Sequence, residues 1–252
     1  MELNAVSGEA RAAWPATAFG SARVVAVAGA GATNIKTTAA VNLAVAFAAA
    51  GVRTELCDLD PAGVATVALG GAAEAAVDRR ESRDVRLSPL APGSLTIGPG
   101  LYPGWRGAAP AERADPPAPT LVLLDCPPRL DAVMRRALAV AQVVLVPVDG
   151  SPLALRVLRE LSATAGDGGG SRLRAVLTRV LSRSVDRWAV LDELSEGFPG
   201  TLYTTTVPMG RSGAPRARDG ARPATLFAPT TTAARAYRAL AREVAADVGL
   251  AL

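Results

Sequence analysis

The stretch RVVAVAGAGATNIKTTAAVNLA, residues 23–44, determines the fold expected for this chain. It opens with residues 23–28, mostly valine and alanine, which favour a buried β-strand. A turn over residues 29–35 follows, and residues 36–50 are strong helix formers that end at Gly51, a typical helix C-cap. A strand, a turn and a helix in this order form the basic unit of a parallel α/β sheet.

The alternation of apolar strands and helices continues to the C-terminus. We expect further strands at residues 53–57, 120–124, 143–146, 173–177 and 202–206. We expect the later helices at residues 130–141, 152–165, 185–196 and 231–248. This pattern predicts an α/β fold with a doubly wound, mostly parallel sheet and helices on both faces.

Two parts of the chain differ from this alternation. Residues 1–22 form an N-terminal lead, and residues 23–252 are expected to form one domain. Within it, residues 71–119 are rich in alanine, glycine and proline, with weak strand candidates only near Val85 and Leu95, and we expect irregular surface structure. No stretch has the features of a signal peptide or a membrane span, so a soluble protein without a membrane partner is expected.

Composition excludes several classes of site. The 252 residues include no histidine, which rules out Ser-His triads, histidine general bases and His-containing zinc sites. The two cysteines, Cys57 and Cys126, are interpreted as small core residues of a protein from a reducing cytoplasm. With 27 Lys+Arg against 23 Asp+Glu, the formal charge of +4 permits an acidic partner such as nucleic acid without requiring one.

Lys36 is the only lysine in the chain, and every other basic side chain is an arginine. Lysine has a compact ammonium group and arginine a planar fork, so the two are not interchangeable at a tight phosphate site. Lys36 is therefore a candidate for a position where arginine would not fit. From composition alone, chance explains a single lysine equally well.

Three polar clusters fall at the ends of predicted strands, at residues 29–36, 58–61 and 125–128. The carboxyl ends of parallel strands share one edge of the sheet, where such folds bind ligands. Lys36 and Thr37 open a helix after a strand and a turn, which is the arrangement of a phosphate site. In such a site backbone N–H groups and the lysine meet the phosphates, and the hydroxyl binds Mg²⁺.

The strict phosphate-loop pattern is not met, because Ala30 and Ile35 occupy its two glycine positions. From this segment alone, an ordinary strand–turn–helix with a solvent-exposed lysine is the simpler interpretation. The other segments make the pattern more specific. Taken together, the chain resembles the ParA/MinD family of deviant Walker P-loop ATPases, in its small ParA form. The segments that carry the resemblance are residues 26–44, 55–66 (ELCDLDPAGVAT), 123–128 (LLDCPP), 143–148, 207–208, 214–215 and 234–243.

The resemblance implies a P-loop NTPase-like fold, ATP and Mg²⁺ as cofactors, and roles for individual residues. Lys36 would bind the β/γ-phosphates, Asp60 would support hydrolysis, and the residues near the metal would be Thr37, Asp58 and Asp125. The phosphate loop would comprise Gly31, Ala32, Thr33, Asn34, Ile35, Lys36, Thr37 and Thr38. The carboxylates have a plain alternative role, because Asp residues at such positions also cap strand ends and turns.

The sequence departs from the family pattern at the loop and at the base site. Gly31 stands where the family has its signature lysine, which reaches the partner's nucleotide, and Ala32 and Thr33 replace two glycines. Ile35 replaces a third glycine, and a β-branched residue resists φ > 0, so the loop must take another shape or bear strain of ~1–3 kcal/mol. Residues 209–210, Met-Gly, replace the Arg-Asn pair whose Asn contacts adenine. We therefore expect weakened nucleotide binding and inefficient hydrolysis.

Arginines near the C-terminus suggest a nucleic-acid surface. Four fall in one loop and three recur along one stripe of the last helix: Arg211, Arg216, Arg218 and Arg222, then Arg235, Arg238 and Arg242. Guanidinium groups spread over a surface suit the phosphate backbone and carry no base specificity. ParA-like proteins bind nonspecific DNA through this general region. An ordinary solvated helix face explains the same residues equally well.

The resemblance implies a partition or positioning protein of the cytoplasm, associated with the nucleoid. ATP would close a homodimer, the dimer would bind nonspecific double-stranded DNA, and a ParB-like partner would trigger hydrolysis and release. Two alternatives remain open at this point. One is a pseudo-ATPase without hydrolysis, acting as a constitutive DNA binder or as the partner of a competent ParA. The other is an ATPase that positions a protein complex.

Overall fold

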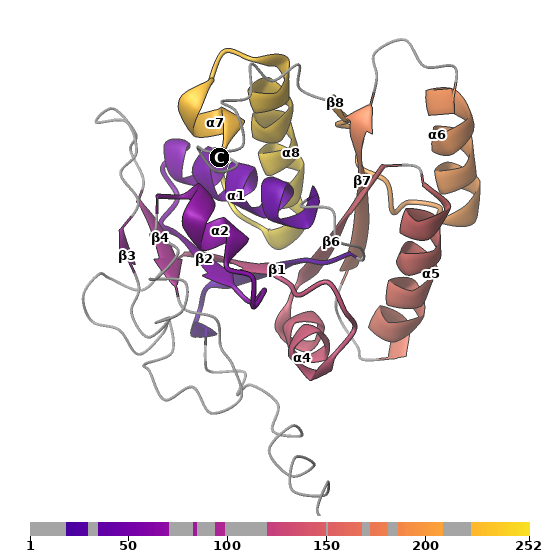
Figure 1. Ribbon diagram of the computed structural model, residues 1–252, viewed down its shortest axis with the longest axis horizontal. Coiled ribbons are helices and arrows are strands. Elements are labelled where there is room, and N and C mark those ends of the chain that lie inside the picture. Colours follow the sequence, from indigo (N-terminus) through magenta and orange to yellow (C-terminus); the bar gives the residue numbers. More distant parts are fainter. Residues whose placement is uncertain are drawn as a thin grey trace, which may run out of the picture.

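The computed structural model consists of a central β-sheet with helices on both faces (Figure 1). It describes residues 19–29, 35–70, 83–84, 94–98, 120–149, 151–167, 172–180, 186–208 and 223–252. No helix of this described part is long and apolar enough to cross a lipid bilayer.

Eight strands of the described chain form the sheet, in the order β3-β4-β2-β5-β1-β6-β7-β8. Their bounds are β1 Arg23–Val27, β2 Thr54–Asp58, β3 Arg83–Asp84, β4 Leu95–Gly98, β5 Leu121–Asp125, β6 Val143–Val148, β7 Arg172–Val180 and β8 Val207–Pro208. Neighbouring strands run parallel, except that β3 pairs antiparallel with β4. The predicted mostly parallel sheet is therefore confirmed.

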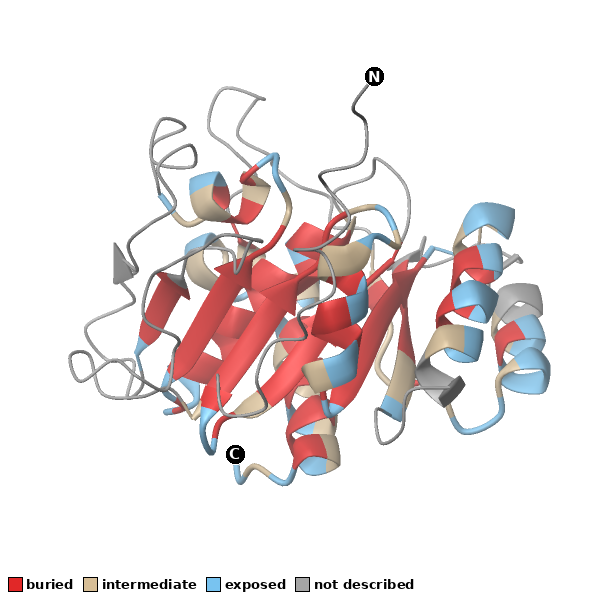
Figure 2. Cartoon of the chain, turned by 90° about the horizontal axis from the view of Figure 1, so that it is seen from below, coloured by how far each residue is buried: buried red, intermediate tan, exposed pale blue. Residues whose placement is uncertain are grey.

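The helices divide between the two faces, and each face has its own hydrophobic core. Their bounds are α1 Ile35–Ala49, α2 Val64–Ala68, α4 Ala132–Val140, α5 Pro152–Asp167, α6 Asp186–Gly197, α7 Ala224–Phe227 and α8 Thr232–Val248. One core joins the sheet to α1, α2 and α8, and the other joins it to α4, α5 and α6. Figure 2 shows the strands almost continuously buried between these layers. Successive strand residues point to opposite faces, so apolar runs are required on strands covered from both sides.

Helix α1 is the most enclosed of the elements that form the site. Nearly all of its side chains are buried, and many are alanines, which let the sheet and α8 approach closely. As predicted, Gly51 follows its end, with a φ of 101° that side-chain-bearing residues rarely adopt. Cys57 and Cys126 are buried free cysteines of the opposite core, which confirms their interpretation as small core residues.

One prediction about a strand was wrong. Residues 202–206 do not form a strand: Leu202 makes an isolated bridge to Ala175, and the strand of this region is β8. The reason is tertiary, because the backbone N–H groups of Thr204 and Thr205 donate to Glu243 of α8 instead of to a neighbouring strand. The weak strand candidate near Leu95 is confirmed by β4, which pairs in parallel with β2, and β3 lies next to the candidate near Val85. Most of residues 71–119 lies outside the described part.

Candidate functional site

Strand register brings two carboxylates together at the carboxyl edge of the sheet. Asp58 at the end of β2 pairs with Asp125 at the end of β5, and Asp125 pairs in turn with Val27 of β1. Paired residues of parallel strands point to the same face, and Val27 belongs to the core beneath α1. Both carboxylates therefore lie on the side of the sheet that α1 covers.

Asp125 is completely buried, and neither of its carboxylate oxygens accepts a hydrogen bond of ordinary geometry among the described residues. Burial, together with the nearby charge of Asp58, raises the pKa of Asp125 to about 8. The Thr37 hydroxyl and the Lys36 ammonium act to lower this pKa, while the charge of Asp60 adds to the increase. A carboxylate in this position favours a proton or a cation.

Lys36 and Thr37 occupy the first turn of α1, next to Asp125, and both are 5% exposed. The alternative interpretation, in which the lysine is solvent-exposed, is therefore wrong. A Cβ placed on Gly29 would lie 3.2 Å from Cγ of Lys36, so the glycine leaves room for the lysine stem along the end of β1. The sequence pattern did not single out Gly29, because its contact is with a side chain seven positions later.

Ile35 is the first residue of α1 and takes a helical backbone conformation. A helical residue has φ < 0, so the strain expected from a β-branched residue at φ > 0 does not arise here. Helix α1 thus accepts an isoleucine where the family pattern has a glycine. Thr38 is exposed. The remaining predicted loop residues lie outside the described part: Gly31, Ala32, Thr33 and Asn34.

Asp60 lies at the same edge and is partly exposed. Its Oδ1 accepts a hydrogen bond of 2.9 Å from the N–H of Ala62, and its carbonyl oxygen accepts one of 2.9 Å from Gly63. Asp60 therefore caps its own turn, as the plain interpretation predicts, while its charge still acts on Asp125.

Asp58 has a structural partner that its sequence position did not reveal. Its Oδ2 accepts hydrogen bonds from the backbone N–H and the hydroxyl of Thr66, at 3.0 and 2.8 Å. Thr66 belongs to α2, so this pair ties the end of β2 to the helix that follows it. The threonine ends the ELCDLDPAGVAT motif, and its place in that motif was the one sequence signal for this contact.

The side chains at this edge suit Mg²⁺ bound together with phosphate, rather than a metal ion whose ligands all come from the protein. The described residues contain no group of three or more His, Cys, Asp or Glu side chains arranged to hold a metal ion. Mg²⁺ prefers oxygen ligands and commonly takes one or two protein oxygens together with phosphates and water. Asp125 and Thr37 provide such oxygens, and the unsatisfied, buried carboxylate of Asp125 is the feature that a cation would stabilise.

The three arginines of α8 differ in their solvent exposure. Arg235 and Arg242 are exposed, whereas Arg238 is partly buried and donates a hydrogen bond of 2.8 Å to the carbonyl oxygen of Pro229. The four predicted loop arginines lie outside the described residues: Arg211, Arg216, Arg218 and Arg222. So do residues 209–210, which stand in place of the adenine contact.

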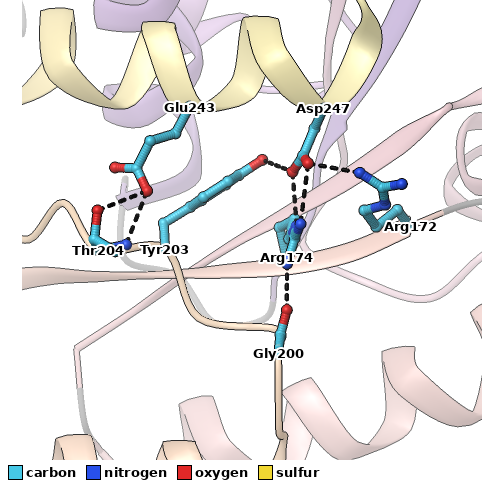
Figure 3. Close-up of polar contacts among 7 residues, drawn as sticks. All are labelled: Arg172, Arg174, Gly200, Tyr203, Thr204, Glu243 and Asp247. Carbon is cyan, nitrogen blue, oxygen red and sulfur yellow. Dashed lines mark hydrogen bonds and ion pairs between the residues drawn. The ribbon is translucent and has the colours of Figure 1, made fainter.

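A set of polar contacts, here called the α8 clamp, joins the acidic side chains of α8 to β7 and to residues 203–205 (Figure 3). Asp247 accepts hydrogen bonds from Arg172, Arg174 and Tyr203, with distances of 2.6 Å, 2.7 Å and 2.8 Å for the shortest to each. Glu243 accepts from the N–H and hydroxyl of Thr204, each at 2.9 Å, and also from the N–H of Thr205. The α8 clamp consists of Arg172, Arg174, Tyr203, Thr204, Thr205, Glu243 and Asp247.

Comparison with known proteins agrees with this geometry. The chain is 34% identical over 233 residues to the chromosome-partitioning ATPase Soj of Thermus thermophilus, covering 84% of this chain and 91% of that protein. It is 31% identical over 257 residues to the chromosome partitioning protein ParA of Caulobacter vibrioides, covering 88% of this chain and 93% of that protein. This chain belongs to the ParA/MinD family of P-loop ATPases.

The fold of this ParA/MinD family member also matches solved structures. Cobyrinic acid a,c-diamide synthase from Mycobacterium smegmatis, with bound ATP analogue and magnesium, superposes with a TM-score of 0.65 at 23% identity. The match covers 88% of this chain and 94% of that one. No protein-family model matches the sequence. The resemblance to the ParA/MinD family, stated from the motifs, is confirmed by the relatives Soj and ParA.

Proposed function

We propose that this chain is a ParA-type partition protein that binds ATP with Mg²⁺ beside Asp125 and binds nonspecific double-stranded DNA through its arginines. Asp125 is the observation that carries the nucleotide part. It is a fully buried carboxylate with no ordinary hydrogen bond to either oxygen among the described residues, next to a buried lysine and a buried threonine. Keeping such a buried carboxylate ionised is costly. Mg²⁺ bound beside it would offset that cost.

Each residue of the site has a proposed part in this binding. The Thr37 hydroxyl would hold Mg²⁺ directly, Asp125 would hold it through water, and Asp58 would add negative charge beside them. Lys36 would bind the β/γ-phosphate oxygens, with the N-terminal N–H groups of α1 around it. When bound, Mg²⁺ supplies positive charge that neutralises the phosphates. Asp60 would support hydrolysis.

The absent signature lysine indicates a weakened ATPase. Lys36 is the only lysine of the chain, so no second lysine is present to reach a partner's nucleotide. Loss of one charge-assisted hydrogen bond to phosphate costs about 1.5–3 kcal/mol. Such a cost corresponds to roughly a tenfold to a hundredfold loss of affinity. We therefore propose that hydrolysis is slow and that ATP binding, rather than turnover, sets the state of the protein.

The DNA part of the proposal rests on family membership and on the exposed guanidinium groups of Arg235 and Arg242. Arginines of one surface neutralise phosphates without reading bases. The proposal includes a homodimer, a ParB-like partner that stimulates release, and a cytoplasmic location on the nucleoid. The loop arginines would extend the surface: Arg211, Arg216, Arg218 and Arg222.

A second candidate function is a pseudo-ATPase. The observation that favours it is Gly31, which occupies the signature lysine position. In that case DNA binding would be constitutive, or the chain would act as the partner of a competent ParA. ATP dependence of DNA binding separates the two candidates.

The experiment that tests the proposal is a titration with fluorescent ATP and Mg²⁺. We expect saturable binding to the wild-type protein and a loss of about tenfold or more, ~1.4 kcal/mol, in both Lys36→Ala and Lys36→Arg. Lys36→Arg should fail because a planar guanidinium does not fit the space beside Gly29. Arg156→Ala is the matched control, since the Arg156 side chain is 69% exposed on α5, away from the site.

Wild-type protein that binds no ATP at millimolar concentration, with DNA binding intact, favours the pseudo-ATPase. Equal binding by all variants excludes the proposed site.

A further inference from the structure

Asn42 lies within α1 and is 3% exposed, yet both ends of its side-chain amide are used. Its Nδ2 donates to the carbonyl oxygen of Thr38 at 2.8 Å, one turn earlier in the helix. Its Oδ1 accepts from the backbone N–H of Thr225 at 3.0 Å and from the Thr225 hydroxyl at 3.1 Å. A buried amide with donors and acceptors satisfied in this way is held in one orientation.

Through this contact α1 provides the N-terminal cap of α7. Helix α7 begins at Ala224, and the residue before it, Pro223, has no side-chain oxygen to accept from the first N–H groups. Such N–H groups have no acceptor inside a helix and are usually satisfied by a capping side chain. Thr225 is the second residue of α7, and Asn42, 183 positions away, supplies the missing oxygen.

Helix α7 is in turn connected to the arginine-bearing end of α8. The N–H of Ala228 donates to the carbonyl oxygen of Ala224, and Thr231 caps α8 by accepting from Ala234. Arg238 closes the same corner by donating to Pro229. In Figure 1, α7 and the start of α8 lie side by side above α1.

The N-terminal end of α1 carries Lys36 and Thr37. Both precede Asn42 by fewer than two helical turns, and a helix of this length moves nearly as a rigid body. The apolar contacts between α1 and α8 have no preferred direction, whereas a hydrogen bond to a helix cap is directional. A shift of the first turn of α1 therefore moves the acceptor on which α7 depends.

We infer that Asn42 is a positioning residue that couples the phosphate end of α1 to the exposed arginines of α8 through the cap of α7. This inference rests on the proposed function, because it requires that one end binds nucleotide and the other binds DNA. It assigns to a buried amide, rather than to a residue at either site, the control of DNA affinity by ATP. Neither Asn42 nor Thr225 belongs to the residues proposed to touch the ligands.

The test measures the affinity for random-sequence duplex DNA with and without Mg²⁺ and a non-hydrolysable ATP analogue. In the wild-type protein we expect the analogue to raise DNA affinity about tenfold, within the usual range of coupling between two sites. Asn42→Leu, which keeps the volume but removes the acceptor, should reduce this ratio to about twofold or less while ATP affinity stays within about threefold of wild type. Thr225→Ser keeps the N–H and the hydroxyl and is the matched control.

The outcomes separate the inference from the proposed function. If the wild-type ratio is high and Asn42→Leu keeps it, the inference is overturned and the proposed function stands. If the analogue does not change the DNA affinity of the wild-type protein, ATP-switched DNA binding fails, and the inference fails with it. Hydrogen exchange guards against simple unfolding: Asn42→Leu should expose the Thr225 amide while α1 stays protected. Unchanged protection of that amide would also overturn the inference.

Discussion

Asp125 is a weak acid in the protein without nucleotide or metal, because it is buried beside another carboxylate. Its pKa of about 8 lies far above the value of about 3.9 in an unfolded chain. At a pH between these two pKa values, Asp125 is protonated in the folded protein and ionised in the unfolded chain. Stability of the ligand-free protein therefore falls as pH rises from about 4 to about 8, by at most about 1.4 kcal/mol per pH unit.

The substitution Asp125→Asn removes this titration. In buffer with a chelator and no nucleotide, we expect the variant to be more stable than wild type at about pH 8.5 and the difference to shrink at about pH 5.5. Urea unfolding at both pH values measures it. Asp192→Asn, at an exposed position of α6, is the control and should unfold like wild type at each pH. Parallel pH profiles for wild type and Asp125→Asn would contradict the expectation. The same variant should also lose the stabilisation that wild type gains from Mg²⁺ with ATP.

At the scale of elements, the acidic side chains of α8 hold it in place, while Arg235 and Arg242 of the same helix are exposed. Partial burial opposes ionisation of Asp247, but hydrogen bonds from Arg174, Tyr203 and Arg172 outweigh it and lower its pKa to about 2. Glu243 also has a lowered pKa, because hydrogen bonds from Thr205 and Thr204 outweigh its burial. The α8 clamp therefore holds the helix against β7 and the segment before β8.

We expect Asp247→Asn to lower the free energy of unfolding by about 1–3 kcal/mol at about pH 7, because charged hydrogen bonds are removed. The folded-state pKa of Asp247 is depressed, so this contribution is present above about pH 4 and disappears as pH falls toward 2. Guanidinium unfolding at about pH 7 and about pH 3 measures the change, with the difference smaller at the lower pH. A difference that is the same at both pH values would show that the charge of Asp247 does not matter.

For the whole molecule, the two faces of the sheet have different tasks. The face under α1 carries Asp58, Asp125, the buried lysine and the α7–α8 unit. The face under α4 and α5 is mainly apolar packing, with Glu55 and Arg136 as buried charged residues. Arginines are spread over the surface, but Arg172 and Arg174 are taken up by Asp247. Arg235 and Arg242 are exposed and lie on the side of the molecule proposed to bind DNA.

We expect the double variant Arg235→Ala/Arg242→Ala to weaken binding to any duplex sequence equally. The slope of log affinity against log salt concentration should become shallower by about 0.9 for each phosphate that is no longer neutralised, or roughly two in total. Fluorescence anisotropy at several salt concentrations measures the slope. Arg156→Ala changes the net charge without touching α8 and serves as the control. If the double variant and the wild-type protein have the same slope, α8 does not take part in DNA binding. Arg238 is left intact because it holds the corner between α7 and α8.

The class of fold and the edge at which the site forms follow from the amino-acid pattern. Apolar strands that alternate with helices require a parallel sheet, and the carboxyl ends of such strands must share one edge. For that reason the amino-acid pattern alone assigns Lys36, Thr37, Asp58 and Asp125 to one place. These assignments need only short segments of sequence, because a strand or helix and its ends can be recognised from neighbouring residues.

The burial of Asp125, the loss of the strand expected at residues 202–206 and the capping of α7 depend on contacts between segments that are distant in the sequence. Strand order places Asp125 between β2 and β1, which makes it buried and weakly acidic. Glu243 takes the N–H groups of Thr204 and Thr205 and so prevents the strand predicted there. Asn42 caps a helix 183 residues away. These contacts join segments that are distant in the sequence. Their hydrogen bonds need a definite distance and angle, which only the complete fold provides.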